Sequence, residues 1–114
     1  MAIQLELNQK RLDLLDKLRQ AVPDFMPSEK NMNDKAYADG ALSGKVKRLI
    51  ALGIALRAGC TNCILAQTMN ALEAGATREE ILETCIVEVA MSGTTGIAES
   101  LRVVELLDEL GKLG

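Results

Sequence analysis

The sequence of 114 residues contains no histidine and no tryptophan. The absence of histidine excludes Ser-His-Asp and Cys-His catalytic arrangements, zinc sites of the HExxH type and any acid–base step through an imidazole. Any chemistry that the chain performs must therefore use cysteine, carboxylates, lysine, arginine, the single tyrosine or a bound cofactor.

Aromatic residues are also scarce: they make up 2% of a chain that is 48% hydrophobic. The apolar side chains are therefore mostly aliphatic, and a composition rich in leucine and alanine favours helices packed on helices over a strand-rich sandwich. The length suits one compact domain and is too short for two separate cores. These features predict an all-α fold in a single domain, residues 1–114.

Strong charge and long apolar segments are missing as well. The formal net charge is −3, which gives no general attraction to nucleic acid or to an anionic membrane. The longest apolar stretch, 49–56, is far shorter than the roughly 20 residues of a membrane-spanning helix. No signal-peptide core is visible. We therefore expect a cytoplasmic protein without nucleic-acid or membrane partners, in which three cysteines do not form a disulfide framework.

Apolar residues at three- and four-residue steps predict an amphipathic helix over residues 3–21, which Pro23 ends. Residues 24–30 are expected to form a connector, followed by at most a short helix around 35–38. For the first forty residues, the sequence thus predicts one long helix followed by a mostly irregular segment.

The rest of the chain has clearer helix signals, with Ser43 and Thr77 as N-caps, Glu80 completing a capping box and Gly59 as a stop. The helix expected from residue 45 to residue 57 is apolar around most of its circumference from Leu49 onward, so we expect it to be buried in the middle of the structure. Residues 92–96 predict a flexible break. The expected helices span 45–57, 61–73, 78–91 and 97–110, which makes a bundle of about five or six helices.

Cys60 and Cys63 form the one motif with reactive chemistry, a CxxC pair directly after Gly59 at a predicted helix start. This spacing places both sulfur atoms on one face, one turn apart, close enough for a disulfide. The helix N-terminus stabilises a thiolate at the first position. We therefore expect Cys60 to be the nucleophile and Cys63 the resolving thiol.

Two other interpretations of the pair stay open. A zinc half-site would need two more ligands, yet the chain has no histidine and Cys85 is the only other thiol. Alternatively, both cysteines are small apolar residues buried in the bundle. The spacing and the position at a helix start favour redox use, without a metal or another cofactor.

Three segments together resemble the core of the carboxymuconolactone decarboxylase family, in the alkylhydroperoxidase D-like branch that carries a CxxC pair. They are KRLIAL (47–52), GCTNCI (59–64) and ALEAGATREEILE (71–83). The resemblance covers about residues 40–110 and leaves 1–39 as an N-terminal helical extension. It implies a helical homo-oligomer, a trimer or hexamer, whose cysteines reduce a small hydroperoxide with the help of a thiol reductant.

The same resemblance implies a proton relay that this chain lacks. The family's glutamate, twelve residues before the first cysteine, corresponds here to Arg48, and its histidine, four residues after the second, corresponds to Gln67. Glutamine can hydrogen-bond a sulfur atom but cannot take up its proton, and arginine stays cationic. We therefore expect this chain to use its two thiols as the family does, but we do not expect it to have the family's proton relay.

Glu88 is the one candidate to replace part of this relay, because it interrupts the apolar run 86–91 near the inward face of its helix. A buried carboxylate needs a partner, and Arg48 lies on the neighbouring buried helix. We hypothesise an ion pair between Glu88 and Arg48 near the cysteines. The alternative is a Glu88 that faces solvent or a subunit interface.

Three functions remain after this comparison. The favoured one is a CxxC dithiol peroxidase or disulfide oxidoreductase. A second is a carboxymuconolactone decarboxylase, although the family's histidine is absent at Gln67. The third is a helical oligomer that binds a small ligand or a protein partner without catalysis.

Overall fold

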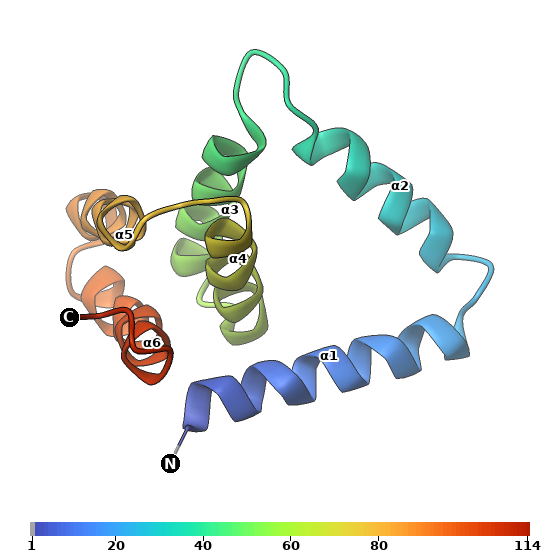
Figure 1. The fold of residues 1–114 in the computed structure, drawn as a ribbon, viewed down its shortest axis with the longest axis horizontal. Helices are drawn as coiled ribbons and strands as arrows, with labels where there is room; N and C mark the ends of the chain where they lie inside the picture. Colours follow the sequence, from blue (N-terminus) through green and yellow to red (C-terminus); the bar gives the residue numbers. More distant parts are fainter. Residues whose placement is uncertain (1) are drawn as a thin grey trace.

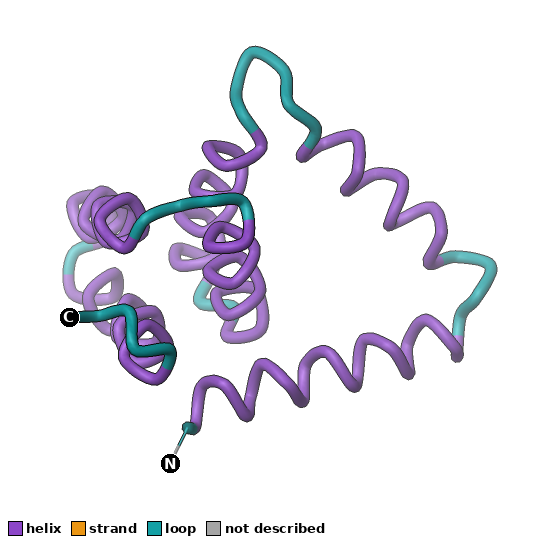
Figure 2. The backbone as a smooth tube through the Cα atoms, viewed as in Figure 1, coloured by secondary structure: helices purple, strands orange, loops and turns teal. Residues whose placement is uncertain are grey.

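Six α-helices make up the computed structural model, which describes residues 2–114 and contains no strand in that range (Figures 1 and 2). The helices are α1 (Ile3–Ala21), α2 (Met26–Tyr37), α3 (Gly44–Ala58), α4 (Thr61–Glu73), α5 (Arg78–Ser92) and α6 (Thr94–Glu109). The expected all-α fold of five or six helices is confirmed.

The predicted caps of α3 and α5 are confirmed. The Ser43 side chain accepts a hydrogen bond from the Val46 backbone N–H at the start of α3. Gly59 ends α3 with a φ of 67°, a left-handed conformation that glycine adopts without a steric penalty. Thr77 and Glu80 form the expected capping box of α5, in which each side chain accepts from the other residue's backbone N–H.

Two boundaries differ from the sequence-based expectation. The segment expected to be a connector and a short helix is one helix of 12 residues, α2, with Pro27 in its first turn. Proline is tolerated there because the first turn has no acceptor for its missing N–H. In addition, α6 begins at Thr94 and not at Ile97, so the break after α5 is the single residue Gly93, with a φ of 65°.

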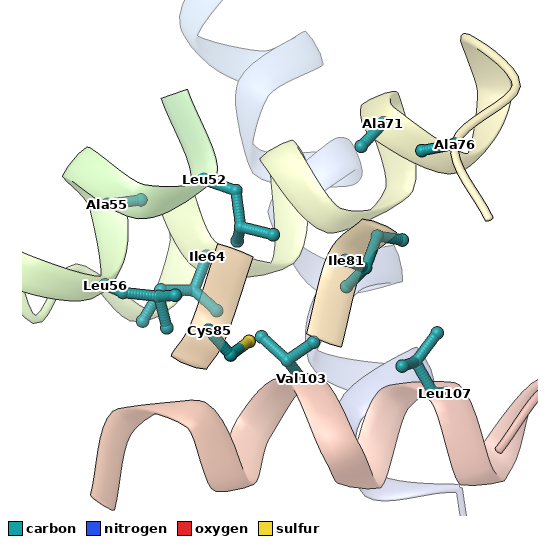
Figure 3. Packing of buried hydrophobic residues seen from close by; sticks show 10 residues of the cluster. All are labelled: Leu52, Ala55, Leu56, Ile64, Ala71, Ala76, Ile81, Cys85, Val103 and Leu107. Carbon is teal, nitrogen blue, oxygen red and sulfur yellow. The ribbon is translucent and has the colours of Figure 1, made fainter. Parts of the chain in front are cut away.

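Helices α3 to α6 pack together, and α1 and α2 extend around one side of them (Figure 1). The first helix contacts α4 and α6, whereas the second contacts mainly α3. The core lies among α3, α4, α5 and α6 and includes the free thiol of Cys85 (Figure 3). Its largest fully buried members are Leu52, Leu56, Ile64, Ile81, Val103 and Leu107.

The third helix is not buried on all sides. Leu52 and Leu56 lie in the core, but Ile50 is 48% exposed and Ile54 is 65% exposed. The expectation of a helix buried in the middle of the structure is therefore wrong for this chain alone, because no helix within residues 2–114 covers this second apolar face of α3. A cleft of about 800 Å³ lies there, between α3 and α5.

Within residues 2–114, no helix combines the length and the apolar character needed to cross a membrane.

Candidate functional site

Cys60 and Cys63 lie at the start of α4 and are joined by a disulfide, with 5.2 Å between their Cα atoms. Cys60 is the N-cap residue of α4, and its Sγ accepts a hydrogen bond from the Cys63 backbone N–H at 3.2 Å. Extended backbone at the N-cap followed by helical backbone brings the two side chains onto the same turn. The pair is therefore positioned by the helix start itself.

The two sulfur-bearing side chains differ in access. Cys63 is exposed and lines a cleft of about 390 Å³ between α1 and α4, whereas Cys60 is partly buried and does not line it. The α4 wall of this cleft consists of Asn62, Cys63, Ala66 and Gln67. The α1 wall consists of Arg11, Leu14, Leu15 and Leu18. Only one of the two cysteines thus meets a molecule that enters the cleft.

The α1 wall follows from helix periodicity. Positions 11, 14, 15 and 18 are three, four and seven residues apart, which places their side chains on one face of the helix. Three of them are leucines, so the wall opposite Cys63 is apolar except at Arg11. The cleft thus combines a sulfur atom, an aliphatic wall and one guanidinium.

Arg48, Gln67 and Tyr37 form a connected polar network beside this cleft. Gln67 Oε1 accepts a hydrogen bond from Arg48 Nη1 at 3.3 Å, and Gln67 Nε2 donates to Tyr37 Oη at 3.4 Å. The Arg48 guanidinium lies 3.5 Å from the centroid of the Tyr37 ring, within cation–π range. A guanidinium and an amide cannot take up the proton of a thiol, so Arg48 and Gln67 contribute hydrogen bonds and charge to this network.

A family model described as the carboxymuconolactone decarboxylase family matches residues 23–106, which include α2 to α5, most of α6 and both cysteines. The chain belongs to this family. The resemblance noted in the sequence is therefore confirmed.

Relatives of this carboxymuconolactone decarboxylase family member span most of its length. The crystal structure of an apo carboxymuconolactone decarboxylase family protein from Legionella pneumophila matches with a TM-score of 0.90 at 29% identity, covering 98% of this chain and 100% of that one. An uncharacterized protein of Cupriavidus necator is 34% identical over 93 residues, 82% of each chain. An uncharacterized protein of the Paracoccus denitrificans cox locus is 35% identical over 74 residues, 65% of this chain and 67% of its own.

Arg48 and Gln67, at which the resemblance leads one to expect a proton relay, contact each other. Sequence reasoning did not include Tyr37, the third member of the network, among the site residues. The signal that could have found it is that it is the only tyrosine of a chain poor in aromatics. Only a short helix around 35–38 was expected there, and its direction relative to α3 and α4 could not be inferred from the sequence.

Glu88 does not pair with Arg48, and the hypothesised ion pair is wrong. Among residues 2–114, the carboxylates within 4.0 Å of a basic group do not include Glu88. Glu88 is 5% exposed, accepts a hydrogen bond from Ser92 Oγ, and lines the separate cleft between α3 and α5. Arg48 instead contacts side chains of α2 and α4, whereas Glu88 belongs to α5 and lines the other cleft.

Cys85, the third cysteine, lies in the core and away from the disulfide. Burial in the core raises the pKa of the Cys85 thiol above its ordinary value. No cluster of three or more histidine, cysteine or acidic side chains suited to a metal occurs in the described part of the chain. The candidate site is therefore the disulfide, the cleft beside it and the adjoining polar network.

Proposed function

We propose that this carboxymuconolactone decarboxylase family member is a dithiol oxidoreductase that reduces hydroperoxides through Cys60 and Cys63. The observation that carries the proposal is the exposed Cys63 on the wall of an apolar cleft, joined to a Cys60 that caps the same helix. The two cysteines belong to one helix start, and the 5.2 Å between their Cα atoms lies within the range that a disulfide spans.

The reaction balances with a hydroperoxide as oxidant and a dithiol as reductant. A cysteine thiolate attacks the terminal oxygen of the hydroperoxide, the O–O bond breaks, and the leaving alkoxide takes a proton from water to give the alcohol. The second thiolate then attacks the sulfur atom of the resulting sulfenic acid, which forms the disulfide and expels hydroxide, and the hydroxide takes a proton from the solvent to become water. A reductant dithiol exchanges with this disulfide, becomes oxidised itself and restores both cysteine thiols.

The difference in solvent access favours different roles for the two sulfur atoms. These roles are the reverse of the sequence-based expectation, in which Cys60 is the nucleophile and Cys63 the resolving thiol. Cys63 faces the cleft, so we propose that its sulfur attacks the hydroperoxide and later receives the reductant. Cys60 receives a backbone N–H at the helix N-terminus, which stabilises a thiolate and makes it a good leaving group when the disulfide is reduced. Cys60 is then the resolving thiol.

The polar network modifies how this chemistry depends on pH. Since neither Arg48 nor Gln67 accepts a thiol proton, the thiolate must form by loss of its proton to water. We therefore expect the rate of oxidation to rise with pH as the thiolate fraction rises, without a second ionisation that lowers it again. A cycling dithiol also fits the reducing cytoplasm expected from the sequence.

The experiment is turnover of tert-butyl hydroperoxide with dithiothreitol as reductant, compared among the wild type, Cys60→Ser, Cys63→Ser and the control Cys85→Ser. We expect both single variants of the pair to lose turnover and Cys85→Ser to keep it, because Cys85 is buried in the core away from the cleft. Turnover that survives the loss of Cys63 would overturn the proposal.

The order of attack has its own test, the reaction of each serine variant with Ellman's reagent. Cys60→Ser should form a stable mixed disulfide at Cys63 quickly, because the exposed sulfur has no resolving partner left. Cys63→Ser should react more slowly at the partly buried Cys60. A faster reaction at Cys60 would restore the order expected from the sequence.

We also propose that the uncovered apolar face of α3 and α5 is where copies of the chain associate. Ile54 is 65% exposed, Val87 65% and Met91 84%, and all three line the 800 Å³ cleft. Contiguous exposed apolar surface of this kind is typical of subunit interfaces. Light scattering should give a mass above that of one chain, and Met91→Lys should reduce it; a monomeric wild type would contradict this proposal.

A further inference from the structure

Arg11 is the only charged side chain among the described residues that line the cleft beside Cys63. It comes from α1, and the leucines at positions 14, 15 and 18 continue its face toward the far end of the cleft. Seven residues of helix separate Arg11 from Leu18, a rise of about 10 Å. The α1 wall thus has a cationic end and an aliphatic end.

The Arg11 guanidinium has no anionic partner within residues 2–114. Its Nε donates to Asn8 Oδ1 at 3.0 Å, and no carboxylate of these residues lies within 4.0 Å. By contrast, Arg78 and Arg102 each approach a glutamate at this range. Burial lowers the pKa of the Arg11 guanidinium, which nevertheless stays cationic at neutral pH. A half-buried cation without a counter-charge loses hydration that an incoming anion can replace.

The geometry points to a substrate class for the proposed peroxidase, on which this inference rests: an aliphatic hydroperoxide that carries a carboxylate. We propose that Arg11 binds the carboxylate and that the hydrocarbon chain lies along Leu14, Leu15 and Leu18, with the cleft open to Cys63. A guanidinium matches a carboxylate through two parallel N–H donors, and its Nη groups are not engaged by another residue of the described chain.

This assignment makes Arg11 a substrate-binding residue that takes no part in bond breaking. A neutral alkyl hydroperoxide would gain only the apolar contacts, whereas a carboxylated one would gain the charged hydrogen bonds as well. We therefore expect the loss of Arg11 to raise the KM for carboxylated hydroperoxides more than the KM for neutral ones.

The first arm of the test measures binding without chemistry, by titrating octanoate and neutral octanol into the disulfide form of the protein. We expect octanoate to bind the wild type more tightly than octanol does. Arg11→Gln should weaken octanoate binding about tenfold and leave octanol unaffected. Arg11→Lys should retain part of the affinity. The matched control is Arg19→Gln, which removes an exposed charge of the same helix outside the cleft and should change nothing.

The second arm compares KM for a carboxylated and a neutral alkyl hydroperoxide with the same variants. An Arg11-dependent octanoate affinity without turnover of any hydroperoxide would retain the carboxylate site and refute the proposed reaction. Turnover with equal octanoate affinity in the wild type and Arg11→Gln would retain the reaction and overturn the role of Arg11. An equal loss of octanoate affinity in Arg19→Gln would also overturn the role of Arg11, because the effect would then come from the general surface charge.

Discussion

The carboxylate of Glu109 at the end of α6 caps the start of α1, 104 residues earlier in the chain. Its two oxygens accept the backbone N–H groups of Gln4 at 3.0 Å and Leu5 at 2.8 Å. Ala2, the N-cap residue of α1, supplies no side-chain acceptor for these N–H groups. Glu109 therefore satisfies donors that the first turn of a helix leaves open, and it ties the cleft-bearing helix to the bundle.

Replacing this carboxylate by the isosteric amide should cost about 1 kcal/mol of unfolding free energy at neutral pH. In Glu109→Gln one oxygen remains to accept one N–H, while the amide nitrogen faces the other N–H and cannot accept it. The charge that favours the helix N-terminus is lost as well. The loss should be read from urea unfolding, together with faster amide hydrogen exchange at Gln4 and Leu5.

The effect should depend on pH in a defined direction. Burial acts to raise the pKa of Glu109, but the hydrogen bonds from the Gln4 and Leu5 backbone outweigh it, so the pKa lies below its ordinary value. A carboxyl whose pKa is lower in the folded state stabilises the fold above its unfolded-state pKa of about 4.3. That stabilisation is lost as the pH falls through the lowered value, and the gap between wild type and variant should close there.

The matched control is Asp108→Asn, which removes the same charge from the neighbouring, exposed position of α6. It should leave the unfolding free energy within about 0.5 kcal/mol of the wild type. The reasoning would be refuted by equal stabilities of the wild type and Glu109→Gln at neutral pH. A difference that persists unchanged in strongly acidic solution would refute it as well.

Two further predictions concern the core. A Cβ added at Gly96 would lie 2.9 Å from the backbone Cα of Val89, so Gly96→Ala should lower the unfolding free energy by about 1–3 kcal/mol in urea unfolding. Gly53→Ala is the control, since its Cβ would meet Thr84 Cγ2 at an ordinary 3.8 Å, and equal losses in the two variants would contradict the packing argument. Because burial raises the pKa of the Cys85 thiol, iodoacetamide should leave it unmodified in the folded, reduced protein while both cysteines of the CxxC pair react; modification of all three at one rate would contradict this.

Five of the six helices could be predicted because their signals are local. Periodic apolar residues, the caps at Ser43 and Thr77 and the stop at Gly59 each depend on a few neighbouring residues. Of the second helix only its end, around 35–38, was expected, because the helix is mostly polar and its apolar pattern is weak. Pro27, which opens that helix, was part of a segment that resembles a turn.

Only those parts of the site that depend on residues close together in the sequence could be predicted. The CxxC pair and its place at a helix start follow from residues 59–63 alone. The cleft does not, because one of its walls is brought to α4 by contacts of α1 with a helix about a hundred residues away. The ion pair between Arg48 and Glu88 was inferred from complementary charge, which does not determine the direction in which either side chain points.

The central claim, a redox-active pair in which the core thiol takes no part, is tested most directly by stoichiometric oxidation. The fully reduced protein, which has three thiols, is treated with one equivalent of tert-butyl hydroperoxide, and thiols are counted before peptide mapping. The account predicts the loss of two thiols, a disulfide joining Cys60 to Cys63, and an unmodified Cys85. Retention of all three thiols, or oxidation of Cys85 with the pair intact, would contradict it.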